Sequence, residues 1–201
     1  MNLTADRIDA IQELVNIGVG RAASVFNEML ECYIRLQVPY INIGSLLELQ
    51  SELEASLGVE RVAAVRQDFS GSFSGIAELV FPTESASTLA AMLTGEEPGT
   101  PDLDAVRIGT LSEVGNILIN SVIGSIGNLL NRRLDYALPR YIEDTVKNLI
   151  ASSHPTTDTT ILLAQTQFTV EQLQIRGDII LIFEVGSFDA LLQAISLEVG
   201  V

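Results

Sequence analysis

The sequence contains very few of the residues that bind transition metals or act as catalytic nucleophiles. One cysteine, Cys32, and one histidine, His154, occur in 201 residues. A lone cysteine excludes an intrachain disulfide and favours a reducing compartment, and one Cys with one His cannot form a Cys/His zinc cluster. His154 lies in the turn-like stretch Ser152–Pro155, and no nucleophile-elbow motif supports a Ser-His-Asp arrangement. Any chemistry of this chain is therefore expected to use carboxylates and carboxamides.

Basic residues and long apolar runs are also scarce. The 11 Lys and Arg residues are outnumbered by 26 Asp and Glu residues, which gives a formal net charge of −15. Such a surface repels nucleic-acid phosphates and anionic lipids, so neither is an expected partner. No uninterrupted apolar stretch reaches the ~18 residues that a membrane span needs, and the N-terminus lacks the basic-then-apolar pattern of a signal peptide. We therefore expect a cytoplasmic protein, without membrane insertion, that acts on other proteins.

An internal repeat is the strongest feature that the sequence does contain. Three positions recur 100 residues later with identical spacing: Glu13, Asn16 and Pro39, and then Glu113, Asn116 and Pro139. A second set recurs at an offset of 102: Phe81, Ser85, Leu89 and Leu93, and then Phe183, Ser187, Leu191 and Ile195. We predict a single domain over residues 1–201 that consists of two repeats, about 1–97 and 102–201, related by pseudo-two-fold symmetry.

Each repeat is predicted to begin with a long amphipathic helix. Apolar residues recur at spacings of three and four in both repeats: Ile11, Val15, Gly18, Ala22, Val25 and Met29, and then Leu111, Gly115, Leu118, Val122, Ile126 and Leu129. Thr4 is the expected N-cap of the first helix, and Asp102 or Asp104 that of the second.

Strands and shorter helices are predicted to follow each long helix. Alternation and β-branched residues indicate strands over Arg35–Ile43, Val62–Phe69, Phe73–Phe81, Thr160–Phe168 and Asp178–Val185. Shorter helices are expected over Leu46–Ser56, Glu84–Leu93, Glu143–Ile150 and Phe188–Ile195. The predicted fold is therefore mixed α/β (α+β), with two long helices and shorter helices packed on a β-sheet.

The repeated polar residues share one face of each long helix. At about 100° per residue, Asp9, Glu13, Asn16 and Gly20 fall within about 60° of one another, opposite the apolar stripe. Glu113, Asn116 and Asn120 do the same on the second helix. A spacing of three residues makes each Glu and Asn neighbours that can touch one bound group. A single such pair is far more often solvated surface, but surface positions drift after duplication, so identical pairs favour a functional site.

This pattern resembles the signature of the CheC/CheX/FliY family of chemotaxis phosphatases, Asp/Ser-x3-Glu-x2-Asn-x22-Pro. The first copy matches it in full and the second matches at Glu, Asn and Pro, with Gly109 in the place of Asp9. The segment Phe73–Pro82 also resembles the central strand of the family. Two motifs in about 200 residues, with no added switch-protein domain, most resemble the CheC branch.

The resemblance implies a phosphatase that hydrolyses the aspartyl phosphate of a CheY-type receiver. Asn16 and Asn116 would orient the attacking water, because a carboxamide can accept one hydrogen bond and donate another, as the water-positioning glutamine of small GTPases does. Glu13 and Glu113 would pair with the active-site lysine of the receiver. No cofactor or metal is implied on this chain, because the receiver holds the Mg²⁺.

The residues around the two pairs are expected to contact the substrate protein. Because they differ between the copies, we predict that both sites are active, with different activities. Asp9 adds negative charge beside Glu13, Gly20 leaves the helix surface bare, and Asn120 adds a hydrogen-bonding group but narrows the approach. The resemblance also implies a second partner, a CheD-type deamidase. The alternative function is therefore a non-enzymatic adaptor for that deamidase or for a receiver domain. The intact pairs in both copies favour the enzyme.

Overall fold

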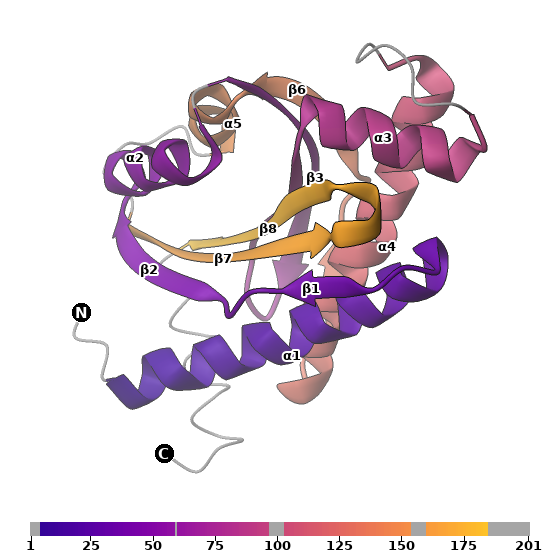
Figure 1. Ribbon diagram of the computed structural model, residues 1–201. Helices are drawn as coiled ribbons and strands as arrows, with labels where there is room; N and C mark the ends of the chain where they lie inside the picture. Colours follow the sequence, from indigo (N-terminus) through magenta and orange to yellow (C-terminus); the bar gives the residue numbers. More distant parts are fainter. Residues whose placement is uncertain (1–4, 59, 97–102, 154–159, 185–201) are drawn as a thin grey trace.

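The chain forms one antiparallel β-sheet with helices on both faces (Figure 1). The computed structural model describes residues 5–58, 60–96, 103–153 and 160–184. The elements of the first half are α1 (Ala5–Leu30), β1 (Ile34–Leu36), β2 (Tyr40–Ser45), α2 (Leu46–Leu57), β3 (Arg61–Gly71), β4 (Gly75–Pro82) and α3 (Thr83–Thr94). The elements of the second half are α4 (Ala105–Leu129), β5 (Leu134–Tyr136), β6 (Arg140–Thr145), α5 (Val146–Ser153), β7 (Thr160–Val170), the 3-10 turn Glu171–Leu173 and β8 (Ile175–Glu184).

The sheet interleaves strands from the two halves of the chain. Its order is β1-β7-β8-β4-β3-β5, with β2 also paired to β7 and β6 also paired to β3. The central pair joins β4 to β8, from Gly75 opposite Phe183 to Val80 opposite Asp178. The predicted mixed α/β fold, with helices packed on a sheet, is therefore confirmed. The division of the chain into two repeats stays a prediction.

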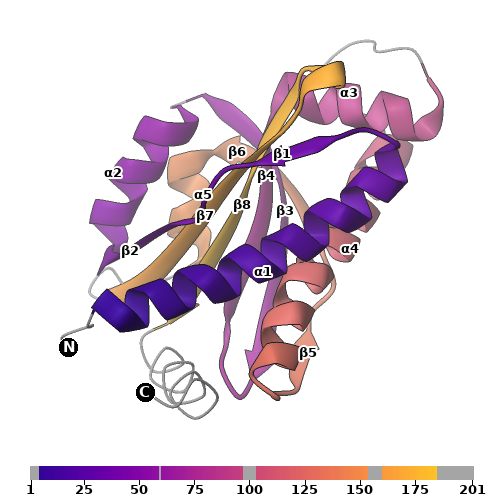
Figure 2. The ribbon, with the colours of Figure 1, turned by 60° about the horizontal axis from the view of Figure 1, so that its bottom comes forward.

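The helices form two layers with different sizes of core. In Figure 2, α1 and α4 cross over one face of the sheet, and α2 and α5 lie on the other. Residues of α1, α3 and α4 join the larger apolar core, and residues of α2 and α5 join the smaller one. A Cβ atom added at Gly18 would lie 2.9 Å from the backbone oxygen of Val122, so the missing side chain lets α1 and α4 approach closely.

The buried stripes of both long helices shift along the surface toward their C-terminal ends. Ile11, Val15, Gly18 and Ala22 are buried as predicted, but Val25 and Met29 are only half-buried, and Phe26 and Leu30 are buried in their place. On α4, Leu129 is 44% exposed, whereas Leu130, which follows the helix, is buried. The predicted apolar positions recur every 3.5 residues on average, whereas a straight helix has 3.6 residues per turn. Each seven residues therefore rotate the predicted stripe by about 20° away from the buried face of the helix.

Several predicted boundaries need correction. The predicted strand Arg35–Ile43 is two strands, β1 and β2, separated by residues 37–39, and Pro39 has no N–H to donate. The predicted helix Glu143–Ile150 begins at Val146, because Glu143–Thr145 pair with β3. Strands β5 and β6 were not predicted. Their residues are half-buried or exposed, so they lack the apolar alternation that predicts a strand.

The remaining predicted elements agree with the structure where it describes them. Strands β3, β4, β7 and β8 and helices α2 and α3 occupy the predicted segments to within a few residues. Asp104 is the N-cap of α4, and its side chain accepts a hydrogen bond from the backbone N–H of Arg107. The expected N-cap Thr4 and the helix Phe188–Ile195 lie outside the described residues. In the described part of the chain, no helix combines the length and apolar character needed to cross a membrane.

Candidate functional site

The first Glu–Asn pair lies on the open surface of α1. Asp9, Glu13, Asn16 and Gly20 are all exposed, as predicted. A Cβ atom added at Gly20 would meet nothing within 4 Å, so the helix surface beside Asn16 is bare. The side chain of Asn16 makes no hydrogen bond with the described residues. Its carboxamide can therefore present either its oxygen or its nitrogen to a bound molecule.

A proline loop lies beside this pair. The side-chain Nε2 of Gln12 donates a hydrogen bond of 2.8 Å to the backbone oxygen of Pro39. Because Gln12 precedes Glu13 in α1, this bond holds the β1–β2 loop close to the pair. Val38, the residue before Pro39, is 75% exposed, and its counterpart before Pro139, Leu138, is 86% exposed. Both loops thus present a large apolar side chain to solvent.

The second pair lies in a more enclosed place on α4. Glu113 is exposed, as predicted, but Asn116 and Asn120 are only half exposed, so the second pair faces solvent less fully than predicted. The Oδ1 atom of Asn116 accepts two hydrogen bonds, one of 2.9 Å from Nδ2 of Asn120 and one of 3.2 Å from Nε2 of Gln67. The same Nε2 of Gln67 donates to the backbone oxygen of Ala137 at 2.9 Å.

Close packing of α4 on the sheet explains why the second pair is enclosed. A Cβ atom added at Gly115 would lie 2.4 Å from Cγ1 of Val65 in β3, so only glycine allows this approach. Side chains two residues apart in a strand point to the same face. Gln67 therefore follows Val65 on the face that α4 covers, next to Asn116.

Tyr136 covers the surface of α4 one turn beyond Asn120. A Cβ atom added at Gly124 would lie 3.5 Å from the Tyr136 hydroxyl oxygen. Burial raises the pKa of Tyr136 above its ordinary value of 10.0. The second pair thus has a tyrosine side chain near its C-terminal side. On its N-terminal side, a Cβ atom added at Gly109 would meet nothing within 4 Å, so the carboxylate missing there leaves open space.

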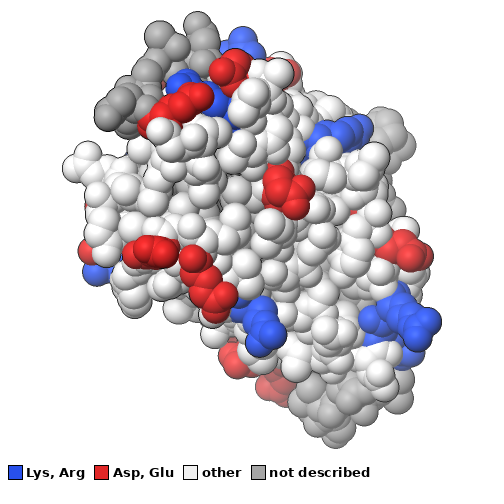
Figure 3. All heavy atoms as spheres, turned by 90° about the vertical axis from the view of Figure 1, so that its right-hand side faces the viewer, with Lys and Arg blue, Asp and Glu red and all other residues white. Residues whose placement is uncertain are grey.

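Charged side chains do not gather into one large patch on the side of the molecule that Figure 3 shows. On the side of the molecule where α3 and α4 lie, acidic and basic side chains are scattered between wide uncharged areas (Figure 3). Among the described residues, no group of three or more His, Cys, Asp or Glu side chains is arranged to hold a metal ion. The prediction that the chain has no metal or cofactor of its own stays a prediction.

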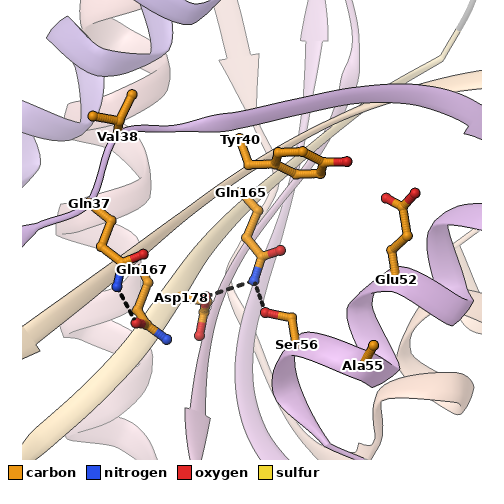
Figure 4. A pocket seen from close by; sticks show the side chains of 9 residues that line it. All are labelled: Gln37, Val38, Tyr40, Glu52, Ala55, Ser56, Gln165, Gln167 and Asp178. Atoms are coloured by element: carbon orange, nitrogen blue, oxygen red, sulfur yellow. Dashed lines mark hydrogen bonds between the residues drawn. The ribbon is translucent and has the colours of Figure 1, made fainter.

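A large groove lies on the α2 side of the sheet, and Val38 of the proline loop is one of its lining residues (Figure 4). Its volume is about 510 Å³. Its lining includes carboxamide and carboxylate side chains: Gln37, Glu52, Gln165, Gln167 and Asp178. Nε2 of Gln165 donates to Oδ1 of Asp178 at 2.8 Å. Burial raises the pKa of Asp178 to about 6, although Gln165 and Arg176 oppose that rise.

Sequence reasoning missed Gln67 and Asp178. Gln67 lies in β3 between two other polar residues, Arg66 and Asp68, so no contrast with its neighbours in the sequence marked it. Its partner Asn116 lies 49 residues away in the sequence. Asp178 was predicted as the first residue of a strand, where a polar residue attracts no attention.

The chain is similar to known chemotaxis proteins. The CheC-like family matches over residues 8–43, which contain Asp9, Glu13, Asn16 and Pro39. The protein "CheY-P phosphatase CheC" of Bacillus subtilis (strain 168) is 27% identical over 142 residues, which are 67% of this chain and 65% of that protein. The match therefore spans slightly less than two thirds of CheC.

Two solved structures share the fold. Thermotoga maritima FliY superposes with a TM-score of 0.80 at 17% identity, covering 98% of this chain and 100% of that one. CheX from Borrelia burgdorferi, solved in a complex with CheY, BeF3 and Mg²⁺, superposes with a TM-score of 0.55 at 22% identity, covering 85% and 97%. Together with the family match, these findings confirm the resemblance to the CheC/CheX/FliY chemotaxis phosphatases that the repeated motif indicated.

Proposed function

We propose that the chain is a phosphatase that hydrolyses the aspartyl phosphate of a CheY-type receiver domain. The observation that carries the proposal is the pair Glu13 and Asn16, exposed one turn apart on α1 inside the segment that matches the CheC-like family. The relative in B. subtilis is named as a phosphatase of phosphorylated CheY. The structure of CheX with CheY supports a receiver as the partner.

The chemistry asked of this chain is small. Water attacks the phosphorus, the bond between phosphorus and the aspartyl oxygen breaks, and the products are a free carboxylate and inorganic phosphate. The acyl phosphate has a good leaving group, and the Mg²⁺ of the receiver neutralises charge. What is lacking is a water held in line. Positioning effects of this kind are worth about 10²-fold, or ~2.7 kcal/mol.

Each pair divides this task between its two side chains. Asn16 and Asn116 orient the water, and Glu13 and Glu113 pair with the active-site lysine of the receiver, which fixes the depth of insertion. Asp9, Gly20 and Asn120 contact the substrate protein around the pairs. Because both lone pairs of Asn116 Oδ1 are taken by Asn120 and Gln67, this residue would hold the water through its Nδ2 donors.

A non-enzymatic adaptor for a CheD-type deamidase or a receiver is the alternative. One observation favours it for the second copy: Asn116 and Asn120 are half-buried and bonded to each other. A residue engaged in this way can serve packing rather than chemistry. An adaptor would bind a receiver without shortening the lifetime of its phosphate.

Phosphate release from a phosphorylated receiver tests the proposal. We expect the chain to accelerate release about 10²-fold over the spontaneous rate, and we expect the folded double variant Asn16→Ala/Asn116→Ala to lose this acceleration. Circular dichroism checks that the variant is folded. Binding without acceleration by the wild-type chain would contradict the phosphatase and support the adaptor.

The source of the metal is a separate prediction. We expect elemental analysis of the purified chain to find no stoichiometric metal, because one His and one Cys are too few for a transition-metal site. Chelation of Mg²⁺ should nevertheless stop hydrolysis, through the receiver. One tightly held zinc or iron per chain would contradict this assignment.

A further inference from the structure

Gln67 is a polar side chain that is buried on the apolar face of β3. Its relative exposure is 2%, and its neighbours on the same face, Val65 and Phe69, belong to the larger core. A carboxamide in such a place is destabilising unless its hydrogen bonds are made. The Oε1 atom of Gln67 has no partner among the described residues. Neither apolar packing nor a hydrogen bond to Oε1 therefore explains why a glutamine occupies this position.

The donors of Gln67 are fully used. Its Nε2 donates to the backbone oxygen of Ala137 and to Oδ1 of Asn116. The first bond ties the carboxamide to the loop before Pro139, and the second directs it at the candidate water-orienting residue. Since Asn120 donates to the same Oδ1, both lone pairs of Asn116 are occupied. The carboxamide of Asn116 is thereby held in one of its two orientations, with Nδ2 free.

We propose that Gln67 is a positioning residue for the second site, which fixes Asn116 so that its Nδ2 donors are left to hold the attacking water. The proposal rests on the phosphatase function proposed above. It concerns the geometry of Asn116 and involves no contact between Gln67 and the substrate. Preorganisation of a water-orienting group raises the rate of the chemical step, because the group does not have to be ordered during the reaction.

The first site lacks this device. Tyr40 pairs with Gln165, and Arg140, 100 residues after Tyr40, pairs with Arg66. By this register, Thr166 takes the place in β7 that Gln67 takes in β3. The Thr166 hydroxyl is too short to repeat the bridge that Gln67 makes, and it has no hydrogen-bond partner among the described residues. Preorganisation by a strand residue therefore belongs to the second site.

Two single-site backgrounds separate positioning from general stability. Asn16→Ala leaves the second site alone, and Asn116→Ala leaves the first site alone. Gln67→Met keeps the length of the side chain and removes both donors. We expect Gln67→Met to lower kcat for receiver dephosphorylation roughly 10- to 100-fold in the Asn16→Ala background. In the Asn116→Ala background we expect a change of less than about 2-fold, because that site does not use Gln67.

Thr166→Val is the matched control. It removes a buried polar group at the corresponding place of the other repeat, and we expect no change of kcat in either background. Equal losses from Gln67→Met in both backgrounds would overturn the proposal, since they would indicate a structural role. An unchanged kcat in the Asn16→Ala background would also overturn it.

A measurement on the free protein tests the same claim without activity. In the Asn16→Ala chain we expect the Nδ2 proton signals of Asn116 to show the nuclear Overhauser contacts of one fixed side-chain orientation, and we expect Gln67→Met to weaken these contacts. If Gln67→Met does not fold, Gln67→Glu serves instead, because its carboxylate faces Oδ1 and should reverse the Asn116 carboxamide. Signals that are unaffected by either variant contradict the proposal.

The outcomes also distinguish this proposal from the phosphatase function. If the Asn16→Ala chain releases phosphate no faster than the Asn16→Ala/Asn116→Ala chain, the second site is not catalytic and both claims fail for it. If the Asn16→Ala chain is active and Gln67→Met leaves its kcat unchanged, the phosphatase stands and only the role of Gln67 is lost.

Discussion

The two Glu–Asn pairs have the same spacing but different surroundings. Asn16 is exposed on α1 and makes no hydrogen bond with the described residues, whereas Asn116 is half-buried on α4 and accepts two. The difference comes from neighbours in other elements, chiefly Gln67 and Asn120. The first copy of the motif is therefore open to a bound protein but has a free asparagine side chain, whereas the second copy is less open but has a fixed asparagine side chain.

The helix–sheet contacts explain part of this difference. The second copy has Gly115 on the helix and Val65 on the strand beneath it. The corresponding residues of the first copy are Val15 on the helix and Ala164 on the strand, both buried. The larger side chain is on the strand in the second copy and on the helix in the first copy, so the two residues together have a similar volume in both copies. The next residue on the same face of the strand is Gln67 in the second copy and Thr166 in the first. This residue determines whether the strand can donate a hydrogen bond to the Asn of the helix.

The largest effect that we predict is a pH-dependent change in the free energy of unfolding, caused by a buried carboxyl group away from the two pairs. Asp178 is buried, and its pKa rises from 3.8 to about 6 on folding. The folded state thus holds its proton more tightly, and stability falls as pH rises from about 4 to 6. Asp178→Asn keeps the acceptor for Gln165 and removes the buried charge. It should raise the free energy of unfolding at pH 8 by on the order of 1–3 kcal/mol.

Urea unfolding at pH 8 and at pH 4 measures this effect. At pH 4 the wild-type carboxyl is largely protonated in the folded state, so the two proteins should differ little. The relative activities of the two pairs should not change in Asp178→Asn, since neither pair is among the residues that line the groove around Asp178. A stability difference that is the same at both pH values would contradict the raised pKa.

A smaller effect separates the two asparagines by stability. Asn16→Ala removes an exposed side chain, so it should change the free energy of unfolding by under ~0.5 kcal/mol. Asn116→Ala leaves donors of Gln67 and Asn120 without their acceptor and should destabilise the chain by about 1 kcal/mol. Denaturant titrations of the two variants compare these values. Equal destabilisation would break the structural comparison on which the difference between the sites rests.

The smallest effect restores to the second site a group that only the first has. Gly109 is exposed, and a Cβ atom added there would meet nothing within 4 Å. In the Asn16→Ala background, Gly109→Asp should raise kcat/KM for the receiver about 3-fold at low salt, because a second carboxylate attracts its lysine. Gly109→Asn is the control for shape without charge. A gain that persists at 1 M salt, or that the Asn variant shares, would contradict an electrostatic cause.

Part of this account could be read from the sequence because it depends on local periodicity. The spacing of Glu13 and Asn16 placed them opposite the buried stripe of α1, and Asp104 was one of two expected N-caps. Strands β5 and β6 were not predicted because their alternation of apolar and polar residues is weak. They pair with β3, which is distant in the sequence, so no local pattern indicates that pairing. The bond between Gln67 and Asn116 spans 49 residues, so no local pattern could indicate it.

The rate of phosphate loss from a phosphorylated CheY-type receiver, measured with Asn16→Ala, Asn116→Ala and the double variant, tests the central claim most directly. We expect both single variants to remain active but unequal. Asn16→Ala should show the higher kcat and the higher KM, because its remaining site is preorganised and enclosed. The double variant should fall to the spontaneous rate. A folded double variant that still accelerates phosphate loss would contradict the claim that these two asparagines carry the activity.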